Sequence, residues 1–258
     1  MPHEFSANLG FLWTDRPLAD AIRAAHAAGF DAVECHWPYD QPVEAVRSAL
    51  LETALPMLGL NTSRGDVESG ENGLSALPGR QKDAQRAINE AIDYAVAIGS
   101  GAVHVMAGFA QGEEAEAAFL ENLAYADDRA KGTDLTLLIE PLNHHDAPGY
   151  FLQTSEQAID LIDKLGRARV KMMFDCYHLQ IMGGDLTRRL EASLPHIGHI
   201  QIASVPARAE PDGGELDYRH VLQELTRLGY DKPIGAEYKP ASGTTDAGLG
   251  WMEPLRTF

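Results

Sequence analysis

The chain has 258 residues, of which 45% are hydrophobic and 23% are charged. At roughly 150 residues per domain, we expect one globular domain over residues 1–258. The 38 Asp and Glu outnumber the 21 Lys and Arg, and the net charge of −17 repels polyanions, so we expect neither nucleic acid nor an anionic membrane as a partner.

Short β-rich runs alternate with longer segments of helical period along the chain. The predicted strands are 5–9, 32–35, 57–61, 102–106, 135–140, 170–174, 197–202 and 233–237. The predicted helices, in which apolar residues recur three and four positions apart, are 18–28, 43–53, 81–98, 113–131, 155–165 and 218–228. Gly29, Gly99 and Gly229 stand where helices should end, and glycine favours the left-handed cap there.

Eight strands in 258 residues match the roughly 250 residues of a (β/α)8 barrel. A doubly wound open sheet is the alternative α/β fold, but the segment after the first strand, Gly10-Phe11-Leu12-Trp13, has no GxGxxG fingerprint. P-loop, HExxH and nucleophile-elbow motifs are also missing from the sequence. We therefore predict an α/β fold, a TIM barrel, with no nucleotide cofactor.

Gly- and Pro-rich sequence is concentrated in two segments. They are residues 61–79, after the third predicted strand, and residues 203–216, after the seventh. In a barrel, long loops that follow strands build the catalytic face. Both segments are therefore expected at one mouth.

The sequence indicates a cytoplasmic protein. Met1–Asp15 carries Glu4 and Asp15 and has no apolar core behind a basic start, so we expect no signal peptide. No stretch approaches the roughly 20 apolar residues that span a bilayer. Cys35 and Cys176 lie far apart and form neither a CxxC motif nor a disulfide framework, which fits a reducing compartment.

Polar side chains that can bind a metal stand at the carboxyl ends of four predicted strands. Glu140 and Glu237 end their strands, Asp175 follows 170–174, and Gln201 lies near the end of 197–202. Because the carboxyl ends of barrel strands meet at one mouth, we expect these side chains to converge. Three carboxylates and one amide oxygen suit Mg²⁺ or Mn²⁺ better than Zn²⁺, which stays an alternative. Such an ion would polarise the carbonyl of a hydroxy-carbonyl substrate.

Two of these carboxylates are candidates for acid and base. Glu140 and Glu237 come from the fifth and eighth strands and would flank a bound carbon chain. One would remove a proton from a carbon and the other would deliver a proton to its neighbour, through an enediol. The sequence leaves open which of them acts first.

The predicted substrate-binding residues lie in the strand-end segments. They are Asn61, His144, His178, Arg208, Glu210 and Lys239. A carboxylate substrate needs a local cation in this acidic protein, and Arg208 suits that role because a guanidinium binds a carboxylate bidentately. His104 is read equally well as a core residue or as a binding residue. His36, His196, His199 and His220 receive no role.

Ordered runs extend this pattern over nearly the whole chain. They are FSANL at 5–9, PYD at 38–40, GD at 65–66, PGR at 78–80, IEPLNH at 139–144, DCYHLQ at 175–180, GHIQIA at 198–203, EYKP at 237–240 and AGL at 247–249. In these runs the chain resembles the hydroxypyruvate isomerase family of the xylose isomerase-like barrels.

The resemblance implies an enzyme of carbohydrate metabolism that interconverts hydroxypyruvate and tartronate semialdehyde or a close analogue. It implies Glu140 and Glu237 as the acid/base pair and Glu140, Asp175, Gln201 and Glu237 as the metal ligands. Related sugar 3-epimerases have His where this chain has Gln201, which favours the isomerase branch. Acidic barrels of this size commonly associate through helices, so a homo-oligomer is compatible with the sequence.

The segment after the seventh strand departs from the family pattern. Ser204 replaces a carboxylate and Ala209 replaces a polar residue, while Ser63 stands where the third-strand loop usually has Pro. The pocket is therefore expected to differ, and a four-carbon acid, as in the similar 2-oxo-tetronate isomerases, is an alternative substrate. The other readings are a ketose 3-epimerase, an endonuclease IV-like enzyme, which the charge disfavours, and a non-catalytic sugar-acid binding barrel.

Overall fold

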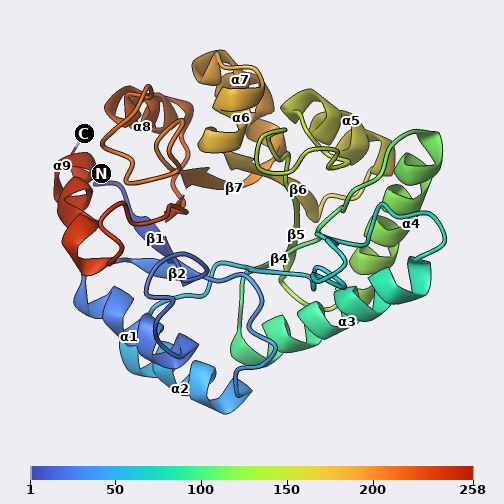
Figure 1. The fold of residues 1–258 in the computed structure, drawn as a ribbon, viewed down its shortest axis with the longest axis horizontal. Coiled ribbons are helices and arrows are strands. Elements are labelled where there is room, and N and C mark those ends of the chain that lie inside the picture. The colour runs from blue at the N-terminus through green and yellow to red at the C-terminus, as the bar shows by residue number, and fades with distance from the viewer. Residues whose placement is uncertain (1, 258) are drawn as a thin grey trace.

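A computed structural model describes residues 2–257. The first and last residues of the predicted domain, Met1 and Phe258, lie outside the described residues. Within 2–257, parallel strands form a central ring and the helices surround it (Figure 1).

Eight strands make up one sheet in the described part of the chain. Their bounds are β1 (Phe5–Asn8), β2 (Ala32–Glu34), β3 (Leu60–Asn61), β4 (Ala102–His104), β5 (Thr136–Ile139), β6 (Val170–Asp175), β7 (Ile197–Ile202) and β8 (Ile234–Ala236). The strand order is β2-β1-β8-β7-β6-β5-β4-β3, and every pair is parallel.

The two edges of this sheet meet, which makes it a barrel. Val33 of β2 bridges Met57, just before β3, and the Leu58 N–H donates to the Val33 carbonyl over 2.7 Å. Regular pairing is limited to Leu60–Asn61 here, shorter than the predicted 57–61. The predicted (β/α)8 barrel is confirmed.

Helices cover the outside of the barrel. They are α1 (Leu18–Ala27), α2 (Val43–Thr53), α3 (Gln81–Ile98), α4 (Glu113–Arg129), α5 (Ser155–Leu165), α6 (Cys176–Met182), α7 (Leu186–Ser193), α8 (Tyr218–Leu228) and α9 (Met252–Arg256), with 3-10 turns at Leu194–His196 and Asp246–Trp251. The helices α6, α7 and α9 were not predicted, because five to eight residues are too few to display a helical period.

The amphipathic pattern explains why these helices pack on the strands. The helix α8, for example, buries Val221, Leu222 and Leu225 while its other face is charged. Each such side chain stabilises the fold by roughly 1.5–3 kcal/mol. Gly99 and Gly229 end α3 and α8 in the left-handed conformation, at φ 75° and 79°, as predicted.

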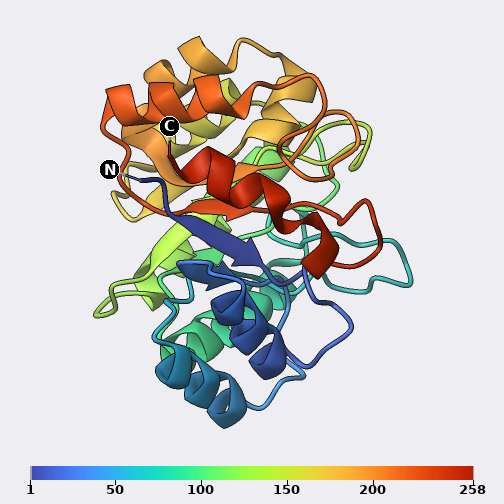
Figure 2. The same ribbon diagram turned by 90° about the vertical axis from the view of Figure 1, so that its left-hand side faces the viewer.

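The long loops project from the carboxyl ends of the strands. Figure 2 shows β1 pointing toward the side of the barrel from which the loop after β3 (teal) extends. This arrangement gathers the segments that follow the strands around one mouth. In residues 2–257, none of the helices is both long and apolar enough to cross a membrane.

Candidate active site

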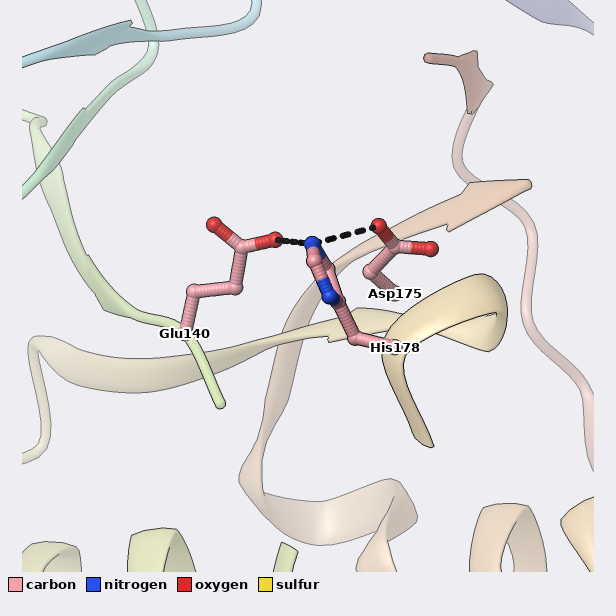
Figure 3. A group of neighbouring side chains, drawn as sticks. All are labelled: Glu140, Asp175 and His178. Atoms are coloured by element: carbon pink, nitrogen blue, oxygen red, sulfur yellow. Dashed lines mark ion pairs between the residues drawn. The ribbon is translucent and has the colours of Figure 1, made fainter. Parts of the chain in front are cut away.

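Three buried side chains from neighbouring elements face one another in the mouth (Figure 3). Glu140 directly follows β5, Asp175 ends β6, and His178 lies in α6. His178 Nε2 is 3.9 Å from Glu140 Oε1 and 3.6 Å from Asp175 Oδ2. Asp175 also caps α6, because its Oδ1 accepts from the Tyr177 N–H over 2.8 Å. The abrupt change from strand to helix therefore places Asp175 and His178 on the same cluster.

Glu237, the residue after β8, is held by three donors. Its Oε1 accepts from Asn8 Nδ2 at 3.0 Å and contacts His36 Nε2 at 2.9 Å, while its Oε2 accepts from Arg208 Nη2 at 2.7 Å. The same Arg208 nitrogen is 3.8 Å from Asp175 Oδ2. Arg208 thus bridges the carboxylates that end β6 and follow β8.

Arg208 is fixed in this position from several sides. Its Nη1 donates to Asp146 Oδ2 over 3.2 Å, and its guanidinium lies 4.9 Å and 5.0 Å from the ring centroids of Phe11 and Tyr177. Its backbone has a φ of 51°, in the left-handed region that a branched or long side chain rarely adopts. These contacts hold the guanidinium in a fixed position in the mouth of the barrel.

Burial and the arginine separate the charge states of the carboxyl groups. Burial, with the charges of Glu237 and Asp175, raises the pKa of Glu140 well above its usual range. Burial and then Glu237 raise the pKa of Asp175 to about 7. Burial acts on Glu237 in the same direction, but Arg208 and then His36 hold the pKa of that carboxyl well below its usual range. Glu237 is therefore the charged member, and Glu140 retains a proton more readily.

His178 is a hydrogen-bond donor toward the mouth. Its Nδ1 accepts from the Asn143 backbone N–H over 3.0 Å, so Nε2 carries the hydrogen and points to Glu140 and Asp175. Burial, with the nearby Arg208, lowers the pKa of His178 well below its usual range. A neutral ring with this tautomer can donate to a substrate oxygen.

Three of the four predicted metal ligands present a buried oxygen without a partner within residues 2–257. Among the described residues, Glu140 Oε1, Asp175 Oδ2 and Gln201 Oε1 are buried oxygens that lack a hydrogen-bond partner. Unpartnered buried acceptors are costly, and oxygens of this kind are the ligands that a hard divalent cation prefers. The oxygens of Glu237 differ, because both already have donors.

The other predicted binding residues lie around this cluster. His144 is exposed, with Nδ1 3.1 Å from Met182 Sδ. Lys239 is exposed, with Nζ 5.5 Å from the Phe11 ring centroid. Glu210 accepts from the Ala241 N–H at 3.1 Å and so ties two loops together. The structure brings His178 and Arg208 to the carboxylates, and it places these three side chains at the rim.

Two further residues that the sequence offered for substrate binding, Asn61 and His104, line the inside of the barrel. Asn61 ends β3, where it lines the interior with His104 and Gln201. His104 is buried with Nδ1 3.6 Å from Glu140 Oε2, and burial lowers its pKa to about 4. His104 is thus a neutral neighbour of Glu140.

Sequence reasoning missed Asn8, Glu34 and His36, which are linked to Glu237 or to Gln201. Each lies at or just beyond the carboxyl end of a predicted strand. The rule that selected Glu140 and Glu237 would have found them, had it been applied to the first two strands.

A family model described as a xylose isomerase-like TIM barrel matches residues 22–255. The chain belongs to this family. Among the curated relatives of this xylose isomerase-like barrel, the 2-oxo-tetronate isomerase of Cupriavidus necator is 43% identical over 254 residues, covering 97% of each chain. The hydroxypyruvate isomerase of Escherichia coli is 38% identical over 257 residues, covering 98% of this chain and 99% of the relative.

A solved structure agrees with this assignment of the fold. The crystal structure of an AP endonuclease, family 2, from Brucella melitensis superimposes with a TM-score of 0.94 at 38% identity, covering 99% of this chain and 100% of that one. Both curated relatives are named isomerases, and we assign this xylose isomerase-like barrel to the same class of enzyme.

Proposed function

We propose that the enzyme is an intramolecular aldose–ketose isomerase of a small hydroxy-oxo acid, either hydroxypyruvate or a 2-oxo-tetronate. One observation carries the proposal: two buried glutamates with opposite charge preferences share a mouth with a buried guanidinium. Paired groups whose pKa values are pushed apart are typical of an acid and a base. The names of the two curated relatives support the same substrates.

The arginine selects an acid. Arg208 is 14% exposed and already binds one carboxylate, that of Glu237, over 2.7 Å. A substrate carboxylate can take over this hydrogen bond, since guanidinium binds carboxylates bidentately. Glu237 then gains a free oxygen and, without the full effect of the guanidinium, a greater affinity for a proton. Binding of the substrate carboxylate to Arg208 thus prepares Glu237 to act as the base.

The two glutamates then move protons. Glu237 takes a proton from the hydroxyl-bearing carbon, and the electron pair forms the carbon–carbon double bond of an enediol as the carbonyl oxygen becomes a hydroxyl. The proton of the neighbouring hydroxyl passes to the former carbonyl oxygen, so that this hydroxyl becomes the new carbonyl, while Glu140 delivers a proton to the former carbonyl carbon. After product release, exchange with solvent removes the proton from Glu237 and returns one to Glu140. The His178 Nε2–H, near both Glu140 and Asp175, donates to the oxygen on which negative charge develops.

A divalent cation held by Glu140, Asp175, Gln201 and Glu237 would bind adjacent substrate oxygens and polarise the carbonyl. The three unpartnered oxygens of Glu140, Asp175 and Gln201 support this part of the proposal.

The test is proton NMR of the purified enzyme with Mg²⁺ or Mn²⁺ and three substrates in turn: hydroxypyruvate, a four-carbon 2-oxo acid and a ketohexose. Migration of the carbonyl in one of the acids is expected, and the faster acid identifies the substrate. Inversion of a stereocentre in the ketohexose alone would make the enzyme an epimerase. Binding of an acid without conversion would make it a binding protein. DNA cleavage is not expected at a net charge of −17.

A further inference from the structure

A further buried carboxylate lies beside the proposed metal site and has no part in the mechanism above. Glu34 ends β2 and is 4% exposed. Its Oε1 accepts from Asn8 Nδ2 at 3.1 Å and from Gln201 Nε2 at 2.7 Å. Its Oε2 lies 2.7 Å from His199 Nε2. Three buried groups from β1 and β7 therefore converge on one carboxylate.

This carboxylate decides which way the Gln201 amide faces. An ionised carboxylate only accepts hydrogen bonds, so Gln201 must turn its NH₂ group to Glu34 and its oxygen away. That oxygen, Gln201 Oε1, is buried without a partner among the described residues. Gln201 pairs in register with Asp175 on the neighbouring strand, so both side chains leave the same face of the sheet. The unpartnered oxygens of the two residues are thus presented together.

Glu34 is also linked to Glu237, the proposed base, through Asn8. The Asn8 NH₂ group that donates to Glu34 Oε1 donates as well to Glu237 Oε1, at 3.0 Å. Asn8 Oδ1 accepts from the Gly10 N–H over 2.9 Å, which fixes the amide in that orientation. One chain of hydrogen bonds therefore runs from Gln201 through Glu34 and Asn8 to Glu237.

A glycine makes room for this network. Gly235 of β8 pairs in register with Gln201, and a Cβ atom there would lie 2.7 Å from Glu34 Oε1 and 2.8 Å from Gln201 Cγ. Real Cβ atoms do not approach so closely, so any side chain at 235 would force Glu34 or Gln201 to shift. The backbone at 235 is not left-handed, and space alone requires glycine. The space that Gly235 leaves for Glu34 is a second observation that supports the network, and it is independent of the hydrogen bonds.

We propose that Glu34 is a positioning residue that holds Gln201 Oε1 ready for a divalent cation and Asn8 against the Glu237 carboxylate. The inference rests on the proposed function, because it assigns Gln201 to the metal. It adds that the affinity for the cation depends on a carboxylate that does not touch the ion.

The test is Mn²⁺ binding to the full-length protein, measured by titration calorimetry and by the EPR signal of free Mn²⁺. Glu34→Gln keeps the shape but has one acceptor oxygen where Glu34 has two, so residue 34 can no longer accept from Gln201, Asn8 and His199 together and no longer holds the Gln201 amide in one orientation. The dissociation constant for Mn²⁺ should rise about 10- to 100-fold, the usual effect of removing an outer partner of a ligand. The double variant Glu34→Gln/Gln201→Glu exchanges donor and acceptor and should recover most of the affinity.

A second pair of variants, Gly235→Ala and Gly59→Ala, tests the same role if Glu34→Gln fails to fold. Gly235→Ala should weaken Mn²⁺ binding in the same way, because its methyl group meets Glu34 and Gln201. The matched control is Gly59→Ala, also in the barrel wall, where the added Cβ would be 3.7 Å from Ala102 Cβ in ordinary contact. Its Mn²⁺ affinity should equal that of the wild type.

The outcomes separate this inference from the proposed function. Wild-type affinity in folded Glu34→Gln, or equal losses in Gly235→Ala and Gly59→Ala, would overturn the positioning role and leave the isomerase proposal intact. A wild-type protein that binds no Mn²⁺ would overturn the metal site itself, and the positioning role with it.

Discussion

The Arg208 guanidinium and the Glu237 carboxylate lie 2.7 Å apart, Nη2 to Oε2, inside the mouth of the barrel. The contact keeps Glu237 charged in a buried place where it would otherwise hold a proton. It also occupies the guanidinium that an acid substrate needs. Substrate recognition and activation of the base are therefore coupled through one ion pair, and the following predictions test the two halves.

Removing the charge of Glu237 should stop turnover. Glu237→Gln keeps the volume of the side chain but cannot accept a proton from carbon, so kcat should fall about 10²- to 10⁴-fold, the range for loss of a general base. Steady-state kinetics with the preferred acid measures the effect, and circular dichroism checks the fold. Near-native kcat in the folded variant would remove Glu237 from the reaction.

Removing Arg208 should act on acids selectively. A hydrogen bond to a charged group contributes about 1.5–3 kcal/mol, so Arg208→Ala should raise KM for hydroxypyruvate roughly 10- to 100-fold. A neutral ketose bound by the same enzyme is the control, and its KM should change far less. Equal increases for the acid and the neutral sugar would contradict carboxylate recognition by Arg208.

Arg208→Lys offers a sharper comparison, because it retains the charge and loses the planar fork. Since Arg208 holds the pKa of Glu237 down, its replacement by Ala should move the acidic limb of the kcat/KM profile to higher pH, and replacement by Lys should move it less. Rates measured between pH 4 and pH 8 decide this. An acidic limb that stays in place in Arg208→Ala would show that another cation sets the charge of Glu237.

Asp175 should make the metal-free protein less stable as the pH rises. Its folded pKa of about 7 exceeds the ordinary 3.8, so the folded state binds more protons between these values. The stabilising contribution of this group is therefore complete below about pH 4 and is lost as the pH rises through about 7, by up to about 1.4 kcal/mol per pH unit.

Asp175→Asn isolates this contribution, because asparagine resembles the protonated acid at every pH. Urea unfolding of both proteins in EDTA at pH 5 and pH 8 gives the comparison. The free energy of unfolding of the wild type, minus that of the variant, should be smaller at pH 8 than at pH 5. A difference that grows with pH would mean that Asp175 is charged and well paired in the folded state.

A divalent cation should reverse that loss. It binds deprotonated carboxylates, so Mn²⁺ should raise the melting temperature more at pH 8 than at pH 5. At 100 times the dissociation constant the stabilisation is about 2.7 kcal/mol, and Asp175→Asn should lose most of it. Thermal melts with and without Mn²⁺ measure both effects, and equal stabilisation of the two proteins would remove Asp175 from the metal site.

The fold was predictable because its signals are local. The periodic apolar residues of α3 and α8 and the left-handed caps at Gly99 and Gly229 depend on residues close together in the sequence. Convergence of Glu140, Asp175, Gln201 and Glu237 followed from topology alone, since parallel barrel strands end at one face.

The strand-end rule can select Asn8, Glu34 and His36, but the contacts that these residues make were not predictable in the same way. His36 contacts Glu237 across 201 positions, and Gln201 contacts Glu34 across 167. Such pairs depend on barrel register and on the space left by Gly235, and no spacing in the sequence encodes them. Likewise, the left-handed backbone that turns Arg208 into the mouth is set by its hydrogen bonds to Ser204 and Lys239.

The most direct test of the central claim is the fate of solvent deuterium. The enzyme is run in D₂O with hydroxypyruvate, or with the four-carbon acid if that is faster, and the product is analysed by proton NMR and mass spectrometry. Two glutamates acting through an enediol predict one solvent deuteron on the former carbonyl carbon and no incorporation by Glu237→Gln. Product that retains the substrate hydrogen at that carbon would contradict the account, because the hydrogen would then have moved directly between the two carbons or on a single group shielded from solvent.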